Sequence, residues 1–159
     1  MRTSVATPHA AAKKTSTGTQ YAALPYRLTP EGVEILLITS RRTRRWIVPK
    51  GWPIEGLTPP ASAAREALEE AGISGEMQKA SLGFFHYFKT LRNNITVPCK
   101  VEVFALKVTR QRKTWAEKEA REQRWFGVAE AARLVGEPQL RRLILKFGAQ
   151  FPAPPLGQH

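Results

Sequence analysis

Residues 49–75, PKGWPIEGLTPPASAAREALEEAGISG, predict a turn, a loop and a helix in one continuous unit. Prolines and glycines interrupt regular structure in the first half of this stretch. Thr58 then precedes two prolines, an order typical of a helix N-terminus, where the missing N–H groups cost little. We therefore expect a helix that begins near Pro59 or Pro60, continues through good helix formers and ends at Gly72, which suits a left-handed C-cap.

Three glutamates of this helix, Glu66, Glu69 and Glu70, stand at i, i+3 and i+4 and therefore project from one face. A solvated acidic face is one interpretation, but such a face usually interleaves Lys or Arg, and only Arg65 lies within the run. Divalent cations such as Mg²⁺ take oxygen ligands and can hold a substrate's phosphates as well. The three glutamates therefore fit either a solvated acidic face or a Mg²⁺ site, with Mn²⁺ as an alternative metal, and residues outside the helix must decide between them.

The spacing of these residues resembles the Nudix box. The box runs Gly, five residues, Glu, seven residues, Arg-Glu-aliphatic, one residue, Glu-Glu, one residue, Gly-aliphatic. The chain matches it with Gly51, Arg65-Glu66, Glu69-Glu70 and Gly72-Ile73. It departs from the box at two positions, because Leu57 replaces the first glutamate and Ala67 is smaller than the usual aliphatic residue. In the family the first glutamate braces the loop against the box arginine, and Glu55 is a candidate substitute for it.

The resemblance implies a phosphoanhydride hydrolase in which water is the nucleophile. It implies that the carboxylates of Glu66, Glu69 and Glu70 are metal ligands. It also implies that a backbone carbonyl of Lys50 or Gly51 completes the metal shell. The catalytic set is then Arg65, Glu66 and Glu69. The general base stays open between a helix glutamate, Glu66 or Glu69, and a glutamate of a later loop, which is Glu117, Glu119 or Glu122.

The formal net charge of +12 indicates a polyanionic partner. Five cations precede the acidic helix and are the candidate phosphate ligands: Arg41, Arg42, Arg44, Arg45 and Lys50. No helix-turn-helix, zinc-ligand or RNA-recognition signature accompanies them, so a small phosphorylated substrate is favoured over nucleic acid. Residues 44–51 and 124–126 look most similar to the diphosphoinositol and dinucleoside polyphosphate branch of the family. The competing class is a non-catalytic module that binds polyanions or RNA.

The rest of the chain predicts strands and helices around this unit. We expect strands at residues 21–28, 33–39, 46–48, 82–89, 96–108 and 123–128, and helices at 129–135 and 138–147, with a loop or short helix at 110–122. This order predicts an α+β fold, an α/β/α sandwich with a mixed sheet between helices, in agreement with the Nudix fold. We divide the chain into a disordered tail (1–19), a Nudix domain (20–148) and a proline-rich tail (149–159).

Cys99 is the only cysteine, and its place in an apolar run predicts a buried thiol rather than a disulfide. A reducing cytoplasm suits such a chain, and we expect a cytoplasmic protein. No apolar run reaches the length of a membrane span, so no membrane partner is expected.

Overall fold

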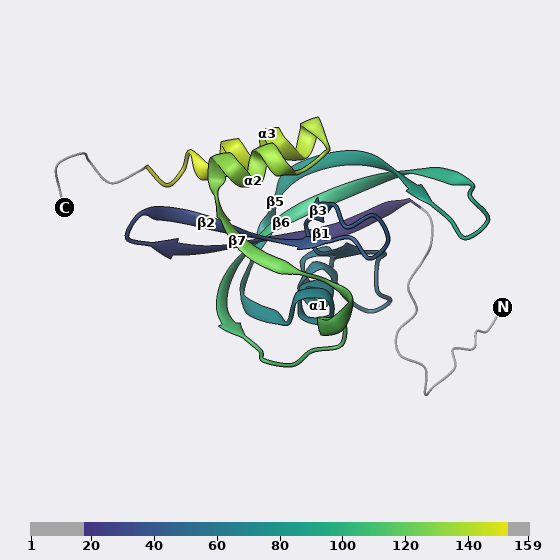
Figure 1. Cartoon of the computed structure of the whole chain (residues 1–159), viewed down its shortest axis with the longest axis horizontal. Helices are drawn as coiled ribbons and strands as arrows, with labels where there is room; N and C mark the ends of the chain where they lie inside the picture. The colour runs from purple at the N-terminus through teal and green to yellow at the C-terminus, as the bar shows by residue number, and fades with distance from the viewer. Residues whose placement is uncertain (1–17, 153–159) are drawn as a thin grey trace.

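A mixed seven-stranded sheet forms the middle layer of the structure, with helices on both faces (Figure 1). The computed structural model describes residues 18–152. The strands are β1 (Thr19–Thr29), β2 (Gly32–Thr39), β3 (Trp46–Ile47), β4 (Lys50–Gly51), β5 (Ile73–Thr90), β6 (Thr96–Gln111) and β7 (Gln123–Gly127). The helices are α1 (Pro59–Ala71), α2 (Val128–Leu134) and α3 (Pro138–Gly148), with a 3₁₀ turn η1 (Lys118–Ala120). The predicted α/β/α sandwich is confirmed.

The order of strands in the sheet is β3-β2-β1-β6-β5, with β4 paired to β1 and β7 paired to β2. The β1–β6 pair is parallel and the others are antiparallel, which makes the sheet mixed. The predicted hairpin of β1 and β2 is confirmed, and its turn is closed by the Thr29 hydroxyl, which donates to the Gly32 carbonyl at 2.8 Å. Gly32 has a φ of 129°, a conformation that favours glycine.

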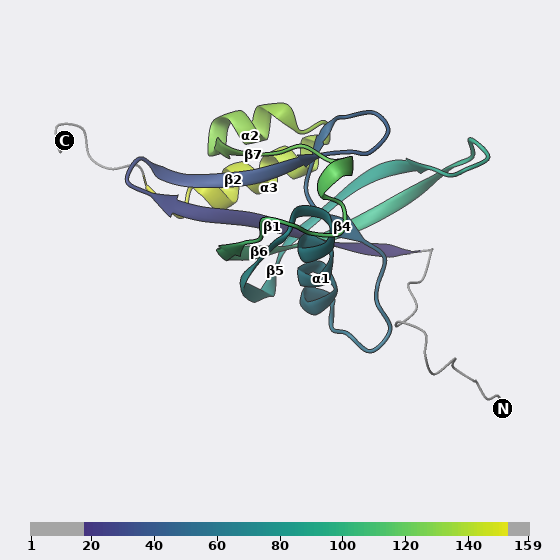
Figure 2. The ribbon, with the colours of Figure 1, turned by 60° about the horizontal axis from the view of Figure 1, so that its bottom comes forward.

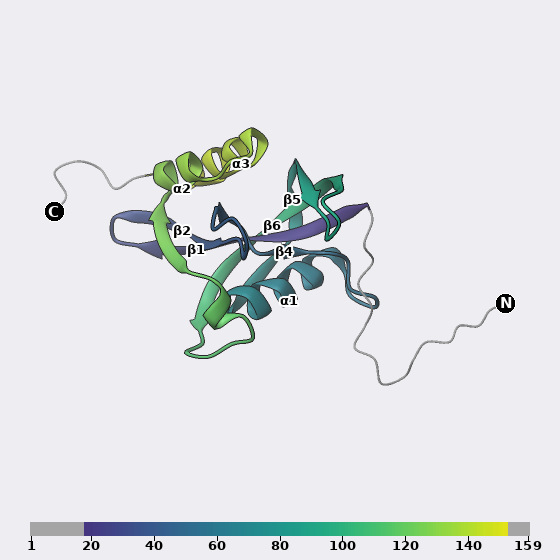
Figure 3. The ribbon, with the colours of Figure 1, turned by 45° about the vertical axis from the view of Figure 1, so that its right-hand side comes forward.

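The two faces of the sheet carry separate apolar layers, and helix α1 lies opposite α2 and α3 (Figure 3). On the face that α2 and α3 cover, Ile144 and Phe147 of α3 pack on the apolar layer of the sheet. On the other face, α1 presents a stripe of alanines at i, i+4 and i+8, namely Ala63, Ala67 and Ala71, all of them buried. Small side chains at this spacing bring the helix close to the sheet, so residues beside the stripe are buried too.

Three elements differ from the sequence prediction, and one of them is the two-residue strand β4, which was not expected. Strand β5 begins at Ile73 rather than at residue 82, and its pairing with β6 shifts register at three places between Ser74 and Gly83. Polar residues and these irregularities break the strict alternation that marks a strand in sequence. Strand β6 likewise continues to Gln111, into a segment expected to be a loop or a short helix. The β5–β6 hairpin extends past the other strands (Figure 2).

The ends of the described chain belong to the fold. Strand β1 starts at Thr19, and residues 1–17 of the predicted N-terminal tail lie outside the described residues. The ring of Phe151, assigned to the C-terminal tail, packs on Tyr26 and Phe147 with centroid distances of 5.6 and 5.1 Å. Cys99 is buried, as predicted. Within residues 18–152, no helix is long and apolar enough to cross a membrane.

Candidate active site

Helix α1 forms as the sequence predicts. The Thr58 side chain accepts a hydrogen bond from the Ala61 N–H at 3.2 Å, and Gly72 ends the helix with a φ of 67°. Glu66 and Glu70 lie directly beside the alanine stripe on the helix surface, and they are only 3% and 8% exposed. Burial of two carboxylates on one helix is costly unless cations or hydrogen bonds compensate them, so this pair is a candidate functional site.

Strand β4 brings the backbone of Lys50 and Gly51 against these carboxylates. Pairing with β1 fixes the strand, with Gly51 opposite Tyr21. The Lys50 N–H donates to Glu70 Oε1 at 3.2 Å. A Cβ at Gly51 would overlap the Glu66 carboxyl and lie 2.8 Å from its Cγ, so only glycine leaves room for this carboxylate. The structure therefore brings together Glu66, Glu70, Lys50 and Gly51, which the sequence predicted as metal-site residues.

The electrostatics of the pair reflect its burial. Burial raises the pKa of the Glu70 carboxyl to about 8, the Arg121 and Lys50 cations oppose this rise, and the Glu66 and Glu117 carboxylates reinforce it. A cation bound between the two helix carboxylates would reduce their mutual repulsion and would also compensate for their poor solvation.

The oxygen donors here fit a hard divalent cation. Carboxylate and carbonyl oxygens are the ligands of Mg²⁺, which also keeps several waters. Glu69, the third predicted ligand, is half-buried. In the part of the chain that the structure describes, no three His, Cys, Asp or Glu side chains already converge as a finished metal site. The predicted ligands thus form a buried pair with Glu69 beside it, and waters or substrate would complete the coordination.

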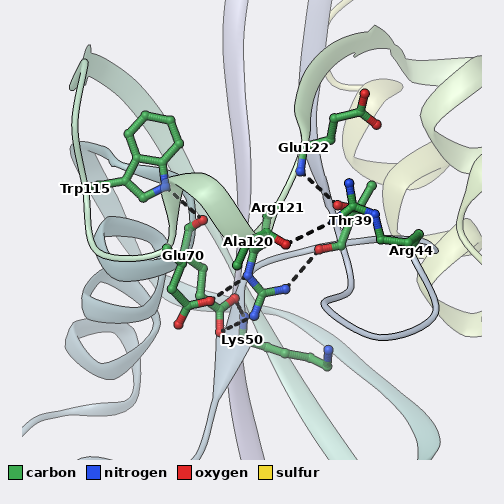
Figure 4. Close-up of polar contacts among 9 residues, drawn as sticks. Thr39, Arg44, Lys50, Glu70, Trp115, Ala120, Arg121 and Glu122 are labelled. Carbon is green, nitrogen blue, oxygen red and sulfur yellow. Dashed lines mark hydrogen bonds and ion pairs between the residues drawn. The ribbon is translucent and has the colours of Figure 1, made fainter.

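Residues 112–122, here called the strap, cross the C-terminal end of α1 (Figure 4). The last carbonyls of a helix have no partner within the helix. From the strap, Glu117 N donates to the Glu69 carbonyl and Trp115 Nε1 to the Glu70 carbonyl, both at 3.2 Å, and Arg112 N donates to the carbonyl of the C-cap Gly72 at 2.8 Å. The Ala71 carbonyl accepts from Gln123 Nε2, at the start of β7, at 2.7 Å. The strap therefore fixes the end of the helix that carries the carboxylates. This role could not be predicted from the sequence, because the strap has no periodic pattern.

The strap also brings Arg121 and Glu117 to the site. Arg121 Nη2 lies 3.7 Å from Glu70 Oε2, and Arg121 Nε donates to Glu117 Oε1 at 2.7 Å. Of the later glutamates considered as general base, Glu117 is thus linked through one guanidinium to the buried pair. Glu119 and Glu122 are both exposed. The choice between Glu117 and a helix glutamate stays a prediction.

Arg65 of α1 and Leu57 of the preceding loop lie together, on a different side of the helix from the buried carboxylates. Arg65 is exposed, and the two side chains line one shallow pocket with Leu68. This proximity fits the predicted contact between the box arginine and the first box position, which leucine replaces. Glu55 is exposed, and its role as a substitute brace stays a prediction.

A basic pocket of about 440 Å³ lies next to Glu70, because Lys50 and Arg121, which contact this carboxylate, also line the pocket. Its cationic lining consists of Arg41, Arg42, Arg45, Lys50, Lys89 and Arg121. Burial lowers the pKa of the Lys50 ammonium, with Glu70 and Glu137 opposing the change, and its Nζ lies 4.9 Å from the Tyr87 ring centroid. Four of the five predicted phosphate ligands therefore share one pocket. The fifth, Arg44, donates through Nη1 to the Ala120 carbonyl at 3.1 Å and ties its loop to the strap.

The fold and this site define the class of protein. The NUDIX domain family matches residues 19–147, and the chain belongs to this family of phosphoanhydride hydrolases. Among curated relatives, Nudix hydrolase 12, mitochondrial, from Arabidopsis thaliana is 33% identical over 118 residues, which are 72% of this chain and 58% of the relative. Diphosphoinositol polyphosphate phosphohydrolase 3-alpha from Mus musculus is 30% identical over 116 residues, or 72% of this chain and 66% of the relative. The chain thus spans less than two thirds of the length of either relative.

Solved structures share the fold. An Ap4A hydrolase from C. elegans, in a binary complex, superposes with a TM-score of 0.62 and 21% identity, over 83% of this chain and 96% of that chain. The NUDIX domain of Shewanella oneidensis NrtR, complexed with ADP ribose, gives a TM-score of 0.61 with 10% identity, over 84% of this chain and 89% of that chain. At these identities the likeness shows the fold alone.

Proposed function

We propose that the protein is a Mg²⁺-dependent pyrophosphohydrolase that cleaves a phosphoanhydride bond in a small, highly phosphorylated substrate. The candidate substrates are nucleoside diphosphate-linked compounds, dinucleoside polyphosphates and diphosphoinositol polyphosphates. One observation carries the proposal: a buried pair of carboxylates lies next to a pocket that is lined by cations. Arg121 belongs to both, because it lies beside Glu70 and lines the pocket.

Each part of the site has a role in this reaction. Glu66, Glu69, Glu70 and a carbonyl of Lys50 or Gly51 would hold the metal, and a bound Mg²⁺ would supply the polarisation of a phosphoryl oxygen and the acidification of a water. The pocket cations other than Arg121 bind the outer phosphates and offset charge on the leaving group. Glu66, Glu69 or Glu117 would accept the proton of the attacking water. Mn²⁺ is a plausible replacement for Mg²⁺, since both take oxygen ligands.

The relatives support the substrate range without selecting within it. One is named for diphosphoinositol polyphosphates, and one structure of the same fold is named for Ap4A. Both names describe substrates with several adjacent phosphates. A pocket with six lining cations suits such a substrate better than one with a single diphosphate.

The test is a substrate panel assayed with Mg²⁺ and with EDTA. The panel contains Ap4A, ADP-ribose, capped RNA, triphosphorylated RNA and a diphosphoinositol polyphosphate. We expect metal-dependent release of phosphorylated products, abolished by EDTA and by Glu70→Gln. Tight binding of these compounds without hydrolysis, in folded protein with Mg²⁺ present, would instead identify a non-catalytic polyanion-binding module.

Arginine variants separate substrate recognition from support of the loop. Arg41→Ala and Arg42→Ala remove cations that line the pocket. A charged hydrogen bond to phosphate contributes about 1.5–3 kcal/mol when partly desolvated, so KM for the substrate with most phosphates should rise about 10-fold or more. The matched control is Arg44→Ala. It removes the same charge from the same loop, but the Arg44 side chain is bonded to the Ala120 carbonyl and does not line the pocket. Equal changes in KM for all three variants would show that the loop acts only through its total charge.

A further inference from the structure

Arg121 joins three parts of the structure through one buried guanidinium (Figure 4). Its side chain is 9% exposed. Nε donates to Glu117 Oε1 of the strap at 2.7 Å, and Nη1 donates to the Thr39 carbonyl at the end of β2 at 3.0 Å. Nη2 lies 3.7 Å from Glu70 Oε2 on α1. A planar guanidinium can face three acceptors in this way because its donors diverge from one rigid group.

The contacts of Arg121 differ in kind. The bonds to Glu117 and Thr39 have ordinary hydrogen-bond lengths, whereas 3.7 Å to Glu70 exceeds that range. Arg121 therefore stabilises the charge of Glu70 without a direct hydrogen bond through this atom. The carboxylate keeps capacity to bind a metal, while its neighbour Glu117 is held in place.

The position of Arg121 is itself fixed. Two more hydrogen bonds tie the adjacent strap residue to β2, from Thr39 N to the Glu122 carbonyl (3.0 Å) and from Glu122 N to Thr39 Oγ1 (2.9 Å). The strap is in turn bonded to the last carbonyls of α1. Arg121 thus sits in a frame that connects β2, the strap and the acidic helix.

We propose that Arg121 is a positioning residue, which holds Glu70 and Glu117 in the arrangement that a divalent metal ion requires at this site. The inference deepens the proposed function and rests on it. Groups around a metal-ligating carboxylate orient it, and their loss weakens metal binding. Arg121 acts on Glu70 through its charge at 3.7 Å and on Glu117 through the hydrogen bond at 2.7 Å. Arg121 acts through the carboxylates and is assigned no contact with the reacting atoms.

The opposite expectation follows if Arg121 is only a counter-charge. A guanidinium near Glu70 repels a metal ion and competes with it for the carboxylate. Its removal would then strengthen metal binding, whereas loss of a positioning group weakens it. The sign of the change in metal affinity therefore distinguishes the two roles.

The experiment is a calorimetric titration of metal-free, full-length protein with Mn²⁺, without substrate. We expect Arg121→Gln to raise the Mn²⁺ dissociation constant about 10- to 100-fold, as for other groups that orient metal ligands. Arg121→Lys should remain weakened by about 10-fold, since an ammonium keeps the charge but lacks the planar fork. The matched control, Lys118→Gln, removes the same charge from an exposed strap residue and should change affinity by less than about twofold.

Thermal unfolding of each variant shows whether that variant is folded. If Arg121→Gln does not fold, Arg121→Lys carries the test, because it preserves the buried charge opposite Glu70 and Glu117. Tighter Mn²⁺ binding by Arg121→Gln, or wild-type affinity in Arg121→Lys, would overturn the positioning role. Failure of the wild-type protein to bind Mn²⁺ would instead overturn the proposed function, so the two failures are distinguishable.

Discussion

Gly51→Ala tests the close approach of strand β4 to the acidic helix. The new Cβ would lie 2.8 Å from Glu66 Cγ and still closer to the carboxyl carbon, whereas ordinary contacts begin at 3.4 Å. The Cγ must therefore retreat by about 0.6 Å and the carboxyl by about 1 Å. Because a misplacement of about 1 Å can reduce the rate 10²-fold, we expect kcat to fall about 10²-fold.

The same substitution should leave the protein folded. Overpacking costs about 1–3 kcal/mol, and replacement of glycine by alanine returns about 0.4–1 kcal/mol through the unfolded chain. The net loss is at most about 2.6 kcal/mol, which lowers Tm by up to about 10 °C for a chain of this size. The side chain that must move is flexible, which favours the lower end of this range.

The assay compares kcat on the best substrate of the panel with Tm from circular dichroism. Gly127→Ala is the matched control, because a Cβ there meets no atom within 4 Å and its φ is −63°. Gly127 precedes α2, so the control can lose up to about 1 kcal/mol of stability as a helix cap but should keep its turnover. Wild-type kcat in folded Gly51→Ala would refute the contact between Gly51 and the Glu66 carboxylate as a requirement of the site.

Three further substitutions test neighbouring parts of the site. Glu70→Gln should lower kcat/KM at least about 10²-fold in folded protein, since it removes charge but little volume, and steady-state kinetics with Mg²⁺ would show it. Leu57→Glu should preserve or raise activity and add less than about 1 kcal/mol through an exposed pair with Arg65; a large loss of activity would show that Leu57 packing is needed. Trp115→Phe removes the indole N–H bond to the Glu70 carbonyl, so we expect a loss of about 1 kcal/mol, seen as a fall in Tm of about 2–4 °C. An unchanged Tm would mean that water replaces this bond.

The acidic helix could be predicted from sequence because its signals are local. Thr58, two prolines and Gly72 mark its ends, and all of them lie within or next to the 13 residues that they delimit. The predicted pair Glu66 and Glu70 faces the β4 backbone because Gly51 and the helix belong to one short motif.

The strap could not be predicted, because its contacts join residues far apart in sequence. Trp115 bonds to a carbonyl 45 residues away, and Arg121 bonds to one 82 residues away. Neither contact leaves a periodic pattern, and a charged segment without period resembles any solvated loop. Arg44 shows the same limit, since its bond to Ala120 spans 76 residues.

The box glutamates are proposed to hold a divalent metal beside the Gly51 backbone. An anomalous difference map from a crystal of the protein grown with Mn²⁺ would locate this metal. We expect a peak between the carboxylates of Glu66, Glu69 and Glu70, about 2.1 Å from their oxygens. The peak should disappear in Glu70→Gln. An Mn²⁺ peak elsewhere on the protein, with none at these carboxylates, would refute the metal site.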